Sequence, residues 1–399
     1  METPTVPAPM PRALLMLFAA AAGLSVANVY YAQPLLDALA REFAISAAAV
    51  GSVVTMTQFG CALALVFMVP LGDRLDRRRL MGVQLVALVA ILTLVGVATS
   101  VPLLLAGMLG VGMLGTAMTQ GLLGYAASAA APAERGRVVG ATQGGVLIGL
   151  LSARVFAGGI ADLAGWRSVY LAAAILMVAL AVPLWRALPR LPHGGARVGY
   201  WRLIASMFAL LREEPLVRAR GWLALLMFAA LNIFWSALTL ALSAPPYQMG
   251  HATIGAFGLA GVAGALAAAR VGGWVDRGLA QRVTLGALAL LVLAWWPLSR
   301  LSASLWLLLV GIVLLDAGAQ ALHVTNQSLI LRVRAGAQSR LIGVYMLFYA
   351  TGSGLGALGA TAAYAHGGWP GVCLLGAAVS LLALACGLRA RQPCALSRA

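Results

Sequence analysis

The sequence predicts an all-α membrane protein whose twelve transmembrane helices form two parallel six-helix repeats, with both termini in the cytoplasm. Three observations predict this fold. Of the 399 residues, 62% are hydrophobic and 10% are charged, whereas soluble domains are about 45–50% apolar and about 25% charged. Apolar segments of membrane-spanning length recur along the chain, and the basic residues gather in alternate loops between them.

The apolar segments number twelve. A helix needs about 20 apolar residues to cross the hydrocarbon core of a bilayer. The segments are residues 12–34, 48–71, 80–99, 102–128, 137–160, 167–187, 220–243, 252–272, 283–299, 303–329, 340–362 and 369–388. Because Arg12 comes directly before the apolar run of the first segment, that segment also resembles a signal peptide. An internal repeat gives it a partner in the second half, which favours a membrane span.

The charges define the two sides of the membrane. All 27 basic residues are arginines, and 23 of them lie on one side, at the termini and in alternate loops. Arg41, Arg167 and Arg300 lie on the other side, and Arg154 lies inside the fifth segment. Cytoplasmic loops carry the excess of positive residues, so we expect both termini in the cytoplasm. This placement excludes the nucleic-acid binding that a net charge of +16 would suggest in a soluble protein.

The only long connection, residues 188–219, divides the chain into an N-terminal half (residues 1–187) and a C-terminal half (residues 220–399). Leu203, Met207 and Leu211 have helical spacing among arginines in this cytoplasmic linker. This pattern suits an interfacial helix on an anionic leaflet. A linker with some helix is the alternative.

The two halves repeat each other at an offset of 203 residues. Asp73-Arg74 corresponds to Asp276-Arg277, and Gly165-Trp166 corresponds to Gly368-Trp369. Parallel six-span repeats place a substrate near the bilayer midplane between the halves, and rocking of the halves gives alternating access. A membrane enzyme is less expected, because the segments contain no nucleophile–base or metal-ligand pattern. The four cysteines form no CxxC pair, so neither a metal site nor a disulfide framework is predicted.

Several stretches resemble the major facilitator superfamily, in particular its twelve-span, efflux-type bacterial branch of drug:proton antiporters and sugar exporters. The resemblance covers essentially the whole chain. It is carried by NVYYAQPLL (28–36), PLGDRLDRRRL (70–80), GLLSARVFAGGIADLAGWR (149–167), GLAGVAGALAAARVGGWVDR (258–277), LLDAGAQALHVTNQSLI (314–330) and SRLIGVYM (339–346).

The resemblance implies a conformational latch at the cytoplasmic ends of the spans. Its first copy, facing span 11, contains Asp73, Arg74, Arg77 and Arg78, and its weaker copy, facing span 5, contains Asp276 and Arg277. Charges that only orient the chain in the membrane are the alternative. The sequence departs from related antiporters, because span 4 has no Arg and span 5 has no Pro. Proton antiport is therefore not implied by the resemblance as a whole.

Ionisable side chains within spans cost about 2.5–3.5 kcal/mol on insertion scales and are functional candidates by default. Arg154, Asp316 and His323 are the three clear cases. At 100° per residue, Asp316, Gln320, His323 and Gln327 share a face within about 60°, and Asn326 flanks it. The alternative role of such residues is interhelical hydrogen bonding. Arg154 could be a counter-charge for Asp316, an anchor for an anionic substrate or a partner of Asp162.

Spans 1, 4, 7 and 10 line the central cavity in the superfamily, and polar side chains fall on those four spans here. Further substrate-cavity candidates are Asn28, Tyr31, Gln120, Asn232 and Trp235, with Tyr345 and Tyr349 from span 11. Tyr30, Tyr31, Trp235, Tyr345 and Tyr349 are placed to stack a substrate.

The sequence predicts a transporter of the bacterial inner membrane that exports a small organic solute by proton antiport. Asp316 is the expected proton carrier, assisted by His323. The chain has no GxxxxGK[ST] motif for ATP, so a gradient must drive it. The expected partners are the solute, protons and lipid; we expect a monomer without cofactor or metal. A proton-independent uniporter or importer is the alternative, followed by a non-transporting receptor.

Overall fold

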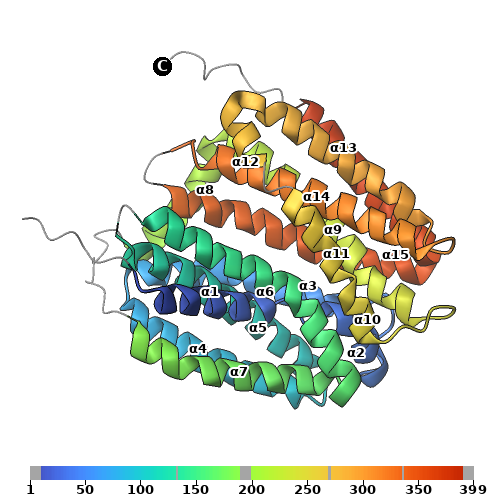
Figure 1. Cartoon of the computed structure of the whole chain (residues 1–399), viewed down its shortest axis with the longest axis horizontal. Helices are drawn as coiled ribbons and strands as arrows, with labels where there is room; N and C mark the ends of the chain where they lie inside the picture. The colour runs from blue at the N-terminus through green and yellow to red at the C-terminus, as the bar shows by residue number, and fades with distance from the viewer. Residues whose placement is uncertain (1–9, 132–133, 189–198, 268–270, 335–336, 390–399) are drawn as a thin grey trace, which may run out of the picture.

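The computed structural model describes residues 10–131, 134–188, 199–267, 271–334 and 337–389. Nearly all of these residues are helical, and none of them lies in a strand. The N-terminal half, blue to green, and the C-terminal half, yellow to red, lie side by side with their helices running in a common direction (Figure 1). The first part of the prediction, an all-α protein, is confirmed.

The N-terminal half begins with a broken helix. The predicted span 12–34 is helical as α1 only to Ala27; a turn and a short 3-10 helix follow, where Pro34 lacks the N–H that an α-helix needs. The elements of this half are α1 (Arg12–Ala27), η1 (Gln33–Leu35), α2 (Leu36–Glu42), α3 (Gly51–Leu63), η2 (Ala64–Met68), η3 (Val69–Asp73), α4 (Arg77–Gly96), α5 (Val101–Ala129), α6 (Arg135–Ala164) and α7 (Trp166–Ala187). Asp76 caps α4 by accepting hydrogen bonds from the backbone N–H groups of Arg78 and Arg79.

The C-terminal half follows the linker helix α8 (Tyr200–Glu213). Its elements are α9 (Pro215–Ser243), α10 (His251–Ala256), α11 (Gly258–Ala267), α12 (Val271–Trp274), η5 (Val275–Leu279), α13 (Ala280–Ser299), α14 (Leu305–Ile330) and α15 (Gln338–Arg389). The last two predicted spans both lie in α15, which is interrupted at Gly368 with φ 58° and ψ −156°. A positive φ is the conformation that glycine adopts without strain, so Gly368 permits the break.

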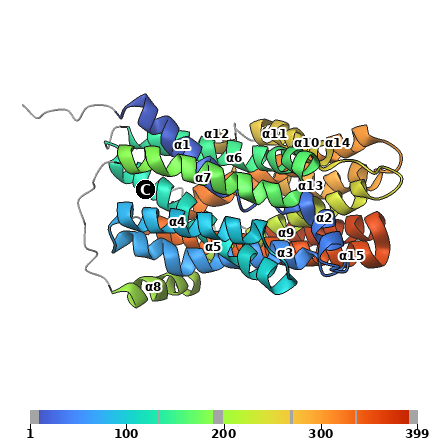
Figure 2. The same ribbon diagram turned by 90° about the horizontal axis from the view of Figure 1, so that it is seen from below.

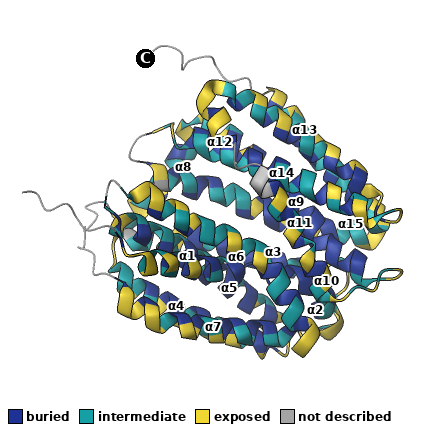
Figure 3. Ribbon diagram, viewed as in Figure 1, coloured by how far each residue is buried: buried dark blue, intermediate teal, exposed yellow. Residues whose placement is uncertain are grey.

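Within the described residues, nine helical stretches are long and apolar enough to cross a membrane, and Arg12–Ala27 and His251–Gly264 are shorter apolar helices. The exposed residues of α7 include large apolar side chains such as Ile175, Val178 and Val182. Exposed positions gather on the outer faces of α7 and α13 (Figure 3). Apolar outer faces of this kind fit a lipid environment.

The linker forms a helix with a buried face, but that face packs on protein. Ile204, Met207 and Leu210 of α8 are buried, and Met207 and Leu210 belong to one apolar cluster with residues of α9 and α15. The Met207 side chain lies against Gly343 at the start of α15. Met207 and Leu211 of the predicted stripe therefore pack on the C-terminal half, and the interfacial position of the helix stays a prediction.

The two ends of the bundle differ. We call the end with α8 and the start of α1 the linker end, and the opposite end, with α2 and α10, the gate end (Figure 2). At the gate end helices of the two halves touch directly: a Cβ on Gly158 of α6 would lie 2.1 Å from the carbonyl oxygen of His251, and one on Gly51 of α3 would lie 2.5 Å from that of Ala357. These close approaches hold the polar residues of the two halves together.

Candidate functional site

Arg154 is the centre of a buried polar cluster between the halves. It projects from α6 and is 6% exposed. Its Nε donates a hydrogen bond to Oε1 of Gln33 at 3.1 Å. Its guanidinium carbon lies 4.0 Å from the ring centroid of Trp235 in α9 and 5.8 Å from that of Tyr30. The guanidinium of the N-terminal half therefore stacks on an aromatic ring of the C-terminal half.

Asp316 supplies a carboxyl group to this cluster from α14. Oδ2 of Asp316 is buried, and none of the described side-chain or backbone groups donates a hydrogen bond to it. The carboxyl contacts Trp235 and is close enough to Arg154 for electrostatic interaction. A Cβ on Gly261 would lie 2.6 Å from Oδ2, so glycine in α11 leaves the space that the carboxyl occupies. A buried carboxyl oxygen without a donor is a site that a proton can fill.

Gln33 links Arg154 to the C-terminal half. Its Nε2 donates to Oδ1 of Asn232 at 3.1 Å, and its backbone carbonyl accepts from the hydroxyl of Thr239 at 2.9 Å. The hydrogen-bonded path from Arg154 through Gln33 to Asn232 therefore crosses from one half to the other. Gln33 was not among the predicted cavity residues, because it lies outside the face of span 1 that carries Asn28 and Tyr31.

A second group of predicted residues surrounds His323. Its Nδ1 lies 2.8 Å from the hydroxyl oxygen of Tyr345, and its ring centroid lies 5.4 Å from that of Phe228. Phe228 also contacts Tyr349, at 4.2 Å between ring centroids, and the Tyr349 hydroxyl is hydrogen-bonded to that of Tyr30. Tyr30 lies beside both Arg154 and Tyr349, so the two groups of residues are continuous.

The C-terminal half contains a buried arginine that the sequence analysis missed. Arg220 is 2% exposed, and its Nη1 donates to the hydroxyl of Thr284 at 2.8 Å and to Oδ1 of Asn326 at 3.4 Å. The arginine count assigned Arg220 to the linker, although it is also the first residue of the predicted segment 220–243. Asn326 was predicted to flank the polar stripe, and it turns toward Arg220.

Two other predicted cavity residues, Tyr31 and Asn28, make their described contacts inside the N-terminal half. The ring of Tyr31 packs on Phe156 and Tyr170 inside the N-terminal half, with centroid distances of 5.3 and 6.5 Å. Asn28 donates to the carbonyl of Leu24 within its own helix. Three further candidates are half-buried on α5 and α14: Gln120, Gln320 and Gln327.

The predicted latch residues make their described contacts within one half. Arg77 donates to the carbonyl of Gly124 and the hydroxyl of Ser128, both in α5, and Arg78 donates to the carbonyl of Trp185 in α7. The described ion pair of Asp276 is with Arg332 of the same half, at 2.5 Å, and not with span 5. Arg74 and Arg277 are exposed, and the side chain of Asp73 lies outside the described part.

A third polar cluster closes the gate end. His251 of α10 lies between two carboxylates of the N-terminal half: its Nδ1 is 2.8 Å from Oδ1 of Asp162, and its Nε2 is 3.0 Å from Oδ1 of Asp37. Asp162 also accepts hydrogen bonds from the backbone N–H groups of His251 and Ala252. Because these groups engage its carboxylate, Asp162 is not the partner of Arg154, which leaves Asp316 or a substrate for that role.

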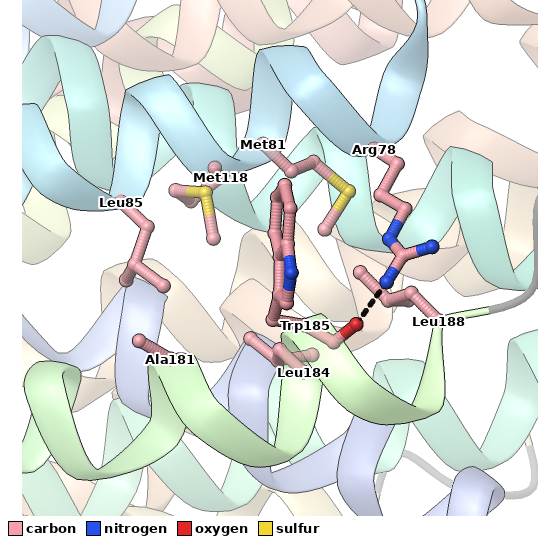
Figure 4. Close-up of a pocket in the computed structure, with 9 residues that line it drawn as sticks. Arg78, Met81, Leu85, Met118, Ala181, Leu184, Trp185 and Leu188 are labelled. Carbon is pink, nitrogen blue, oxygen red and sulfur yellow. Dashed lines mark hydrogen bonds between the residues drawn. The ribbon is translucent and has the colours of Figure 1, made fainter.

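A small pocket lies elsewhere, among α4, α5 and α7 (Figure 4). Its volume is about 20 Å³, room for about one water molecule. The lining residues include Arg78, Met118 and Trp185, and none of them belongs to the Arg154 cluster. This pocket is too small to hold an organic solute.

A multi-pass helical protein whose two halves meet at a buried polar cluster has the architecture of a membrane transporter. The comparisons agree, and the chain belongs to the Major Facilitator Superfamily, whose family model matches residues 14–301. The uncharacterized transporter YgaY of Escherichia coli O157:H7 is 40% identical over 372 residues, which are 93% of this chain and 94% of that protein. A protein of Streptomyces coelicolor named "Probable transporter SCO4007" is 33% identical over 386 residues, covering 92% of this chain and 85% of that protein.

Solved structures show the same fold at low sequence identity. A bacterial homologue of the human lysosomal transporter Spinster, in an inward-facing and unoccupied conformation, has a TM-score of 0.72 and 15% identity over 95% of this chain and 98% of that one. A D-xylose-proton symporter has a TM-score of 0.73 and 14% identity over 93% of this chain and 97% of that one. Membership of the family and the relatives named as transporters make the chain a multi-pass membrane transporter rather than an enzyme.

Proposed function

We propose that this chain is a secondary transporter of the bacterial inner membrane that exports a small organic solute in exchange for protons. The observation that carries the proposal is the buried carboxyl of Asp316 in one half, within electrostatic range of the Arg154 guanidinium of the other half. The "Inner membrane transport protein YnfM" of Escherichia coli (strain K12), 26% identical over 273 residues, supports the location. The composition and the absence of an ATP motif from the sequence support a gradient-driven mechanism.

The proposed topology has twelve spans and cytoplasmic termini. Nine helical stretches of spanning length become twelve when α1 and α10–α11 each contribute one span and α15 is divided at Gly368. The excess of arginines at the termini and in alternate loops supports this orientation. The N-terminal half (1–187) and the C-terminal half (220–399) are then six-span repeats joined by the cytoplasmic linker 188–219.

The conformation is proposed to be inward-facing. With this topology the gate end lies on the periplasmic side, where His251, Asp37 and Asp162 join the halves. At the linker end, the described ion pair of the latch residue Asp276 stays within one half. We therefore propose that the halves separate on the cytoplasmic side, where a hydrogen bond from the Tyr200 hydroxyl of α8 to the carbonyl oxygen of Phe67 would have to open.

Protonation of Asp316 provides a mechanism for coupling. An ionised Asp316 attracts Arg154, and this attraction spans the two halves. A proton on Asp316 removes the attraction and fills the oxygen that lacks a donor. The balance between conformations then depends on whether the carboxyl carries a proton, which is the requirement for using a proton gradient.

The solute is proposed to bind beside this pair. Trp235, Tyr30 and Tyr349 offer aromatic faces, and Asn232 and His323 offer hydrogen-bonding groups. A few polar groups among aromatic side chains are the usual composition of a small-molecule site. A solute that interacts with Asp316 would compete with the proton, and competition of this kind produces exchange.

Proteoliposomes containing a trapped pH indicator test the proposal. We expect a solute gradient to move protons in the opposite direction, and Asp316→Asn to abolish this movement. Glu213→Gln is the matched control, because Glu213 is an exposed carboxylate paired with Arg334 on the surface. Proton movement in the same direction as the solute would contradict antiport, and an Asp316→Asn protein that still concentrates solute would remove Asp316 from coupling.

A further inference from the structure

The cluster at the gate end is assembled from both halves. Asp37 comes from α2 and Asp162 from α6, whereas His251 is the first residue of α10. The exposed fraction of the His251 side chain is 17%, and those of Asp37 and Asp162 are 7% and 33%. The imidazole is therefore largely withdrawn from water only while the two halves are in contact.

The geometry of His251 requires an additional proton. Both ring nitrogens lie within 3.0 Å of a carboxylate oxygen. A neutral imidazole carries a single N–H, so its second nitrogen would direct a lone pair at an ionised carboxylate. An imidazolium donates from both nitrogens and satisfies both contacts. Protonating either carboxylate instead would also place one additional proton in the cluster.

The surrounding charges balance with the imidazolium present. Arg41 of α2 donates to Oδ2 of Asp37 at 2.9 Å, so two carboxylates are matched by Arg41 and His251. Helix α6 also carries Arg154, whose guanidinium is directed to Gln33 and Trp235. The sequences of α11 and of α9 from residue 229 to its end contain no ionisable residue.

We infer that closing the gate end binds one proton in the Asp37–His251–Asp162 cluster, so this cluster is a second proton site, separate from Asp316, whose occupancy favours the closed gate. When the halves separate there, His251 leaves both carboxylates and returns to water. The proton is then released on the gate side. The cluster thus links the proton concentration on that side to the conformational equilibrium.

The direction of the pH effect follows from the partners of His251. The pKa of His251 is raised in the closed state, and the largest cause is its hydrogen bond with Asp37. Burial lowers this pKa, and Asp162 raises it further. With the gate open, the pKa of an exposed histidine is about 6.5. Below that pH both states carry the proton. Above it, closing takes up a proton, and the ratio of closed to open molecules falls up to about tenfold per pH unit until the closed state also loses the proton.

Distances between spin labels at the gate end test the inference without measuring transport. Labels carried by genetically encoded unnatural amino acids at the exposed positions Ser46 and Ser302, one in each half, leave the native cysteines intact. The ratio of short to long distances in nanodiscs is measured from pH 5 to pH 9. We expect the short distance to dominate at low pH and the ratio to fall above about pH 6.5.

Three variants separate the proton site from a structural contact. His251→Gln should abolish the pH dependence, whereas His366→Gln should retain it, because His366 is exposed and its described hydrogen bond is to the carbonyl of Ala362 in its own helix. Asp37→Asn should keep the gate closed at pH 8. A neutral His251 can donate from Nδ1 to Asp162, and the new asparagine amide can donate to Nε2 of the same ring, so no additional proton is needed.

The inference is overturned if the wild-type ratio does not change with pH, or if His251→Gln keeps the wild-type slope. If His251→Gln does not fold, Asp37→Asn decides: an unchanged slope contradicts the inference, and a closed gate at pH 8 supports it. The wild-type slope should persist in an Asp316→Asn background. Its loss there would assign the pH dependence to Asp316 and overturn the second site, whatever the outcome of the transport experiment.

Discussion

Arg154 and Arg220 are both buried arginines in an apolar chain, but their surroundings differ in one respect. Arg154 lies between the halves, stacked on Trp235 and close to the carboxyl of Asp316. Arg220 lies inside the C-terminal half, and its described hydrogen bonds go to the neutral side chains of Thr284 and Asn326. The charge of Arg154 is therefore opposed by an acid across the interface, whereas that of Arg220 has neutral neighbours in the described part of the chain.

Arg154 is therefore a charge whose surroundings depend on the arrangement of the halves, whereas the surroundings of Arg220 stay the same. In the proposed mechanism the halves rock against each other, and the distance between Arg154 and Asp316 then changes because the two residues belong to different halves. Arg220, Thr284 and Asn326 belong to one half and move together. We therefore expect substitution of Arg154 to affect transport strongly, and substitution of Arg220 to affect mainly stability.

The largest effect is expected for Arg154→Gln. This change removes the guanidinium and leaves the buried Asp316 carboxyl without a nearby positive charge, and an uncompensated buried charge is strongly destabilising. We predict loss of solute-driven proton movement in proteoliposomes and a lower unfolding temperature in detergent. Full exchange activity in this variant would contradict the role of Arg154 at the centre of the site.

A smaller effect, an increase in stability, is expected when Asp316→Asn is added to Arg154→Gln. The double variant contains no unbalanced charge at the interface, so it should be more stable than Arg154→Gln alone. Coupling energies of interacting residues are about 0.5–3 kcal/mol in such cycles. Thermal unfolding of all four proteins measures this coupling, and additive effects of the two substitutions would show that the residues do not interact. Proton exchange should remain absent in the double variant.

The smallest effect is expected for Arg220→Gln. The glutamine amide retains a donor for Thr284 or Asn326, and loss of a buried charge with neutral partners relieves its desolvation cost. We predict a change of about 1 kcal/mol or less in the free energy of unfolding and retained proton exchange. Loss of exchange with normal folding would place Arg220 on the path of the solute or the proton, and the comparison with Arg154 would fail.

Sequence reasoning predicted the fold and part of the site. Helical spacing selected Asp316 and His323, and the cost of ionisable groups in a bilayer selected Arg154. The structure brings Arg154 and Asp316 together with Trp235, and it places His323 beside Tyr345. Their roles in coupling and solute binding stay predictions, since geometry alone does not measure transport.

Other residues could not be found from the sequence. Gln33 joins Arg154 to Asn232 because a turn ends α1 near Ala27 and changes the direction of the chain. His251 and Asp37 are 214 residues apart, and each looks like an ordinary loop residue at the edge of an apolar segment. Tyr31 faces Phe156 inside one half, because the end of α1 departs from the regular helix assumed for span 1.

The sequence by itself determined that this protein is a helical membrane protein, because apolar length and arginine placement depend only on local composition and on the cost of moving charge into lipid. Its resemblance to the major facilitator superfamily, which the family match confirms, indicated a transporter. Only the tertiary structure decided which polar faces meet. Helical periodicity assigns a residue to a face of its own helix, but the partner of that face depends on how two halves pack across hundreds of residues. The Arg154–Asp316 pair and the Asp37–His251–Asp162 cluster are consequences of that packing.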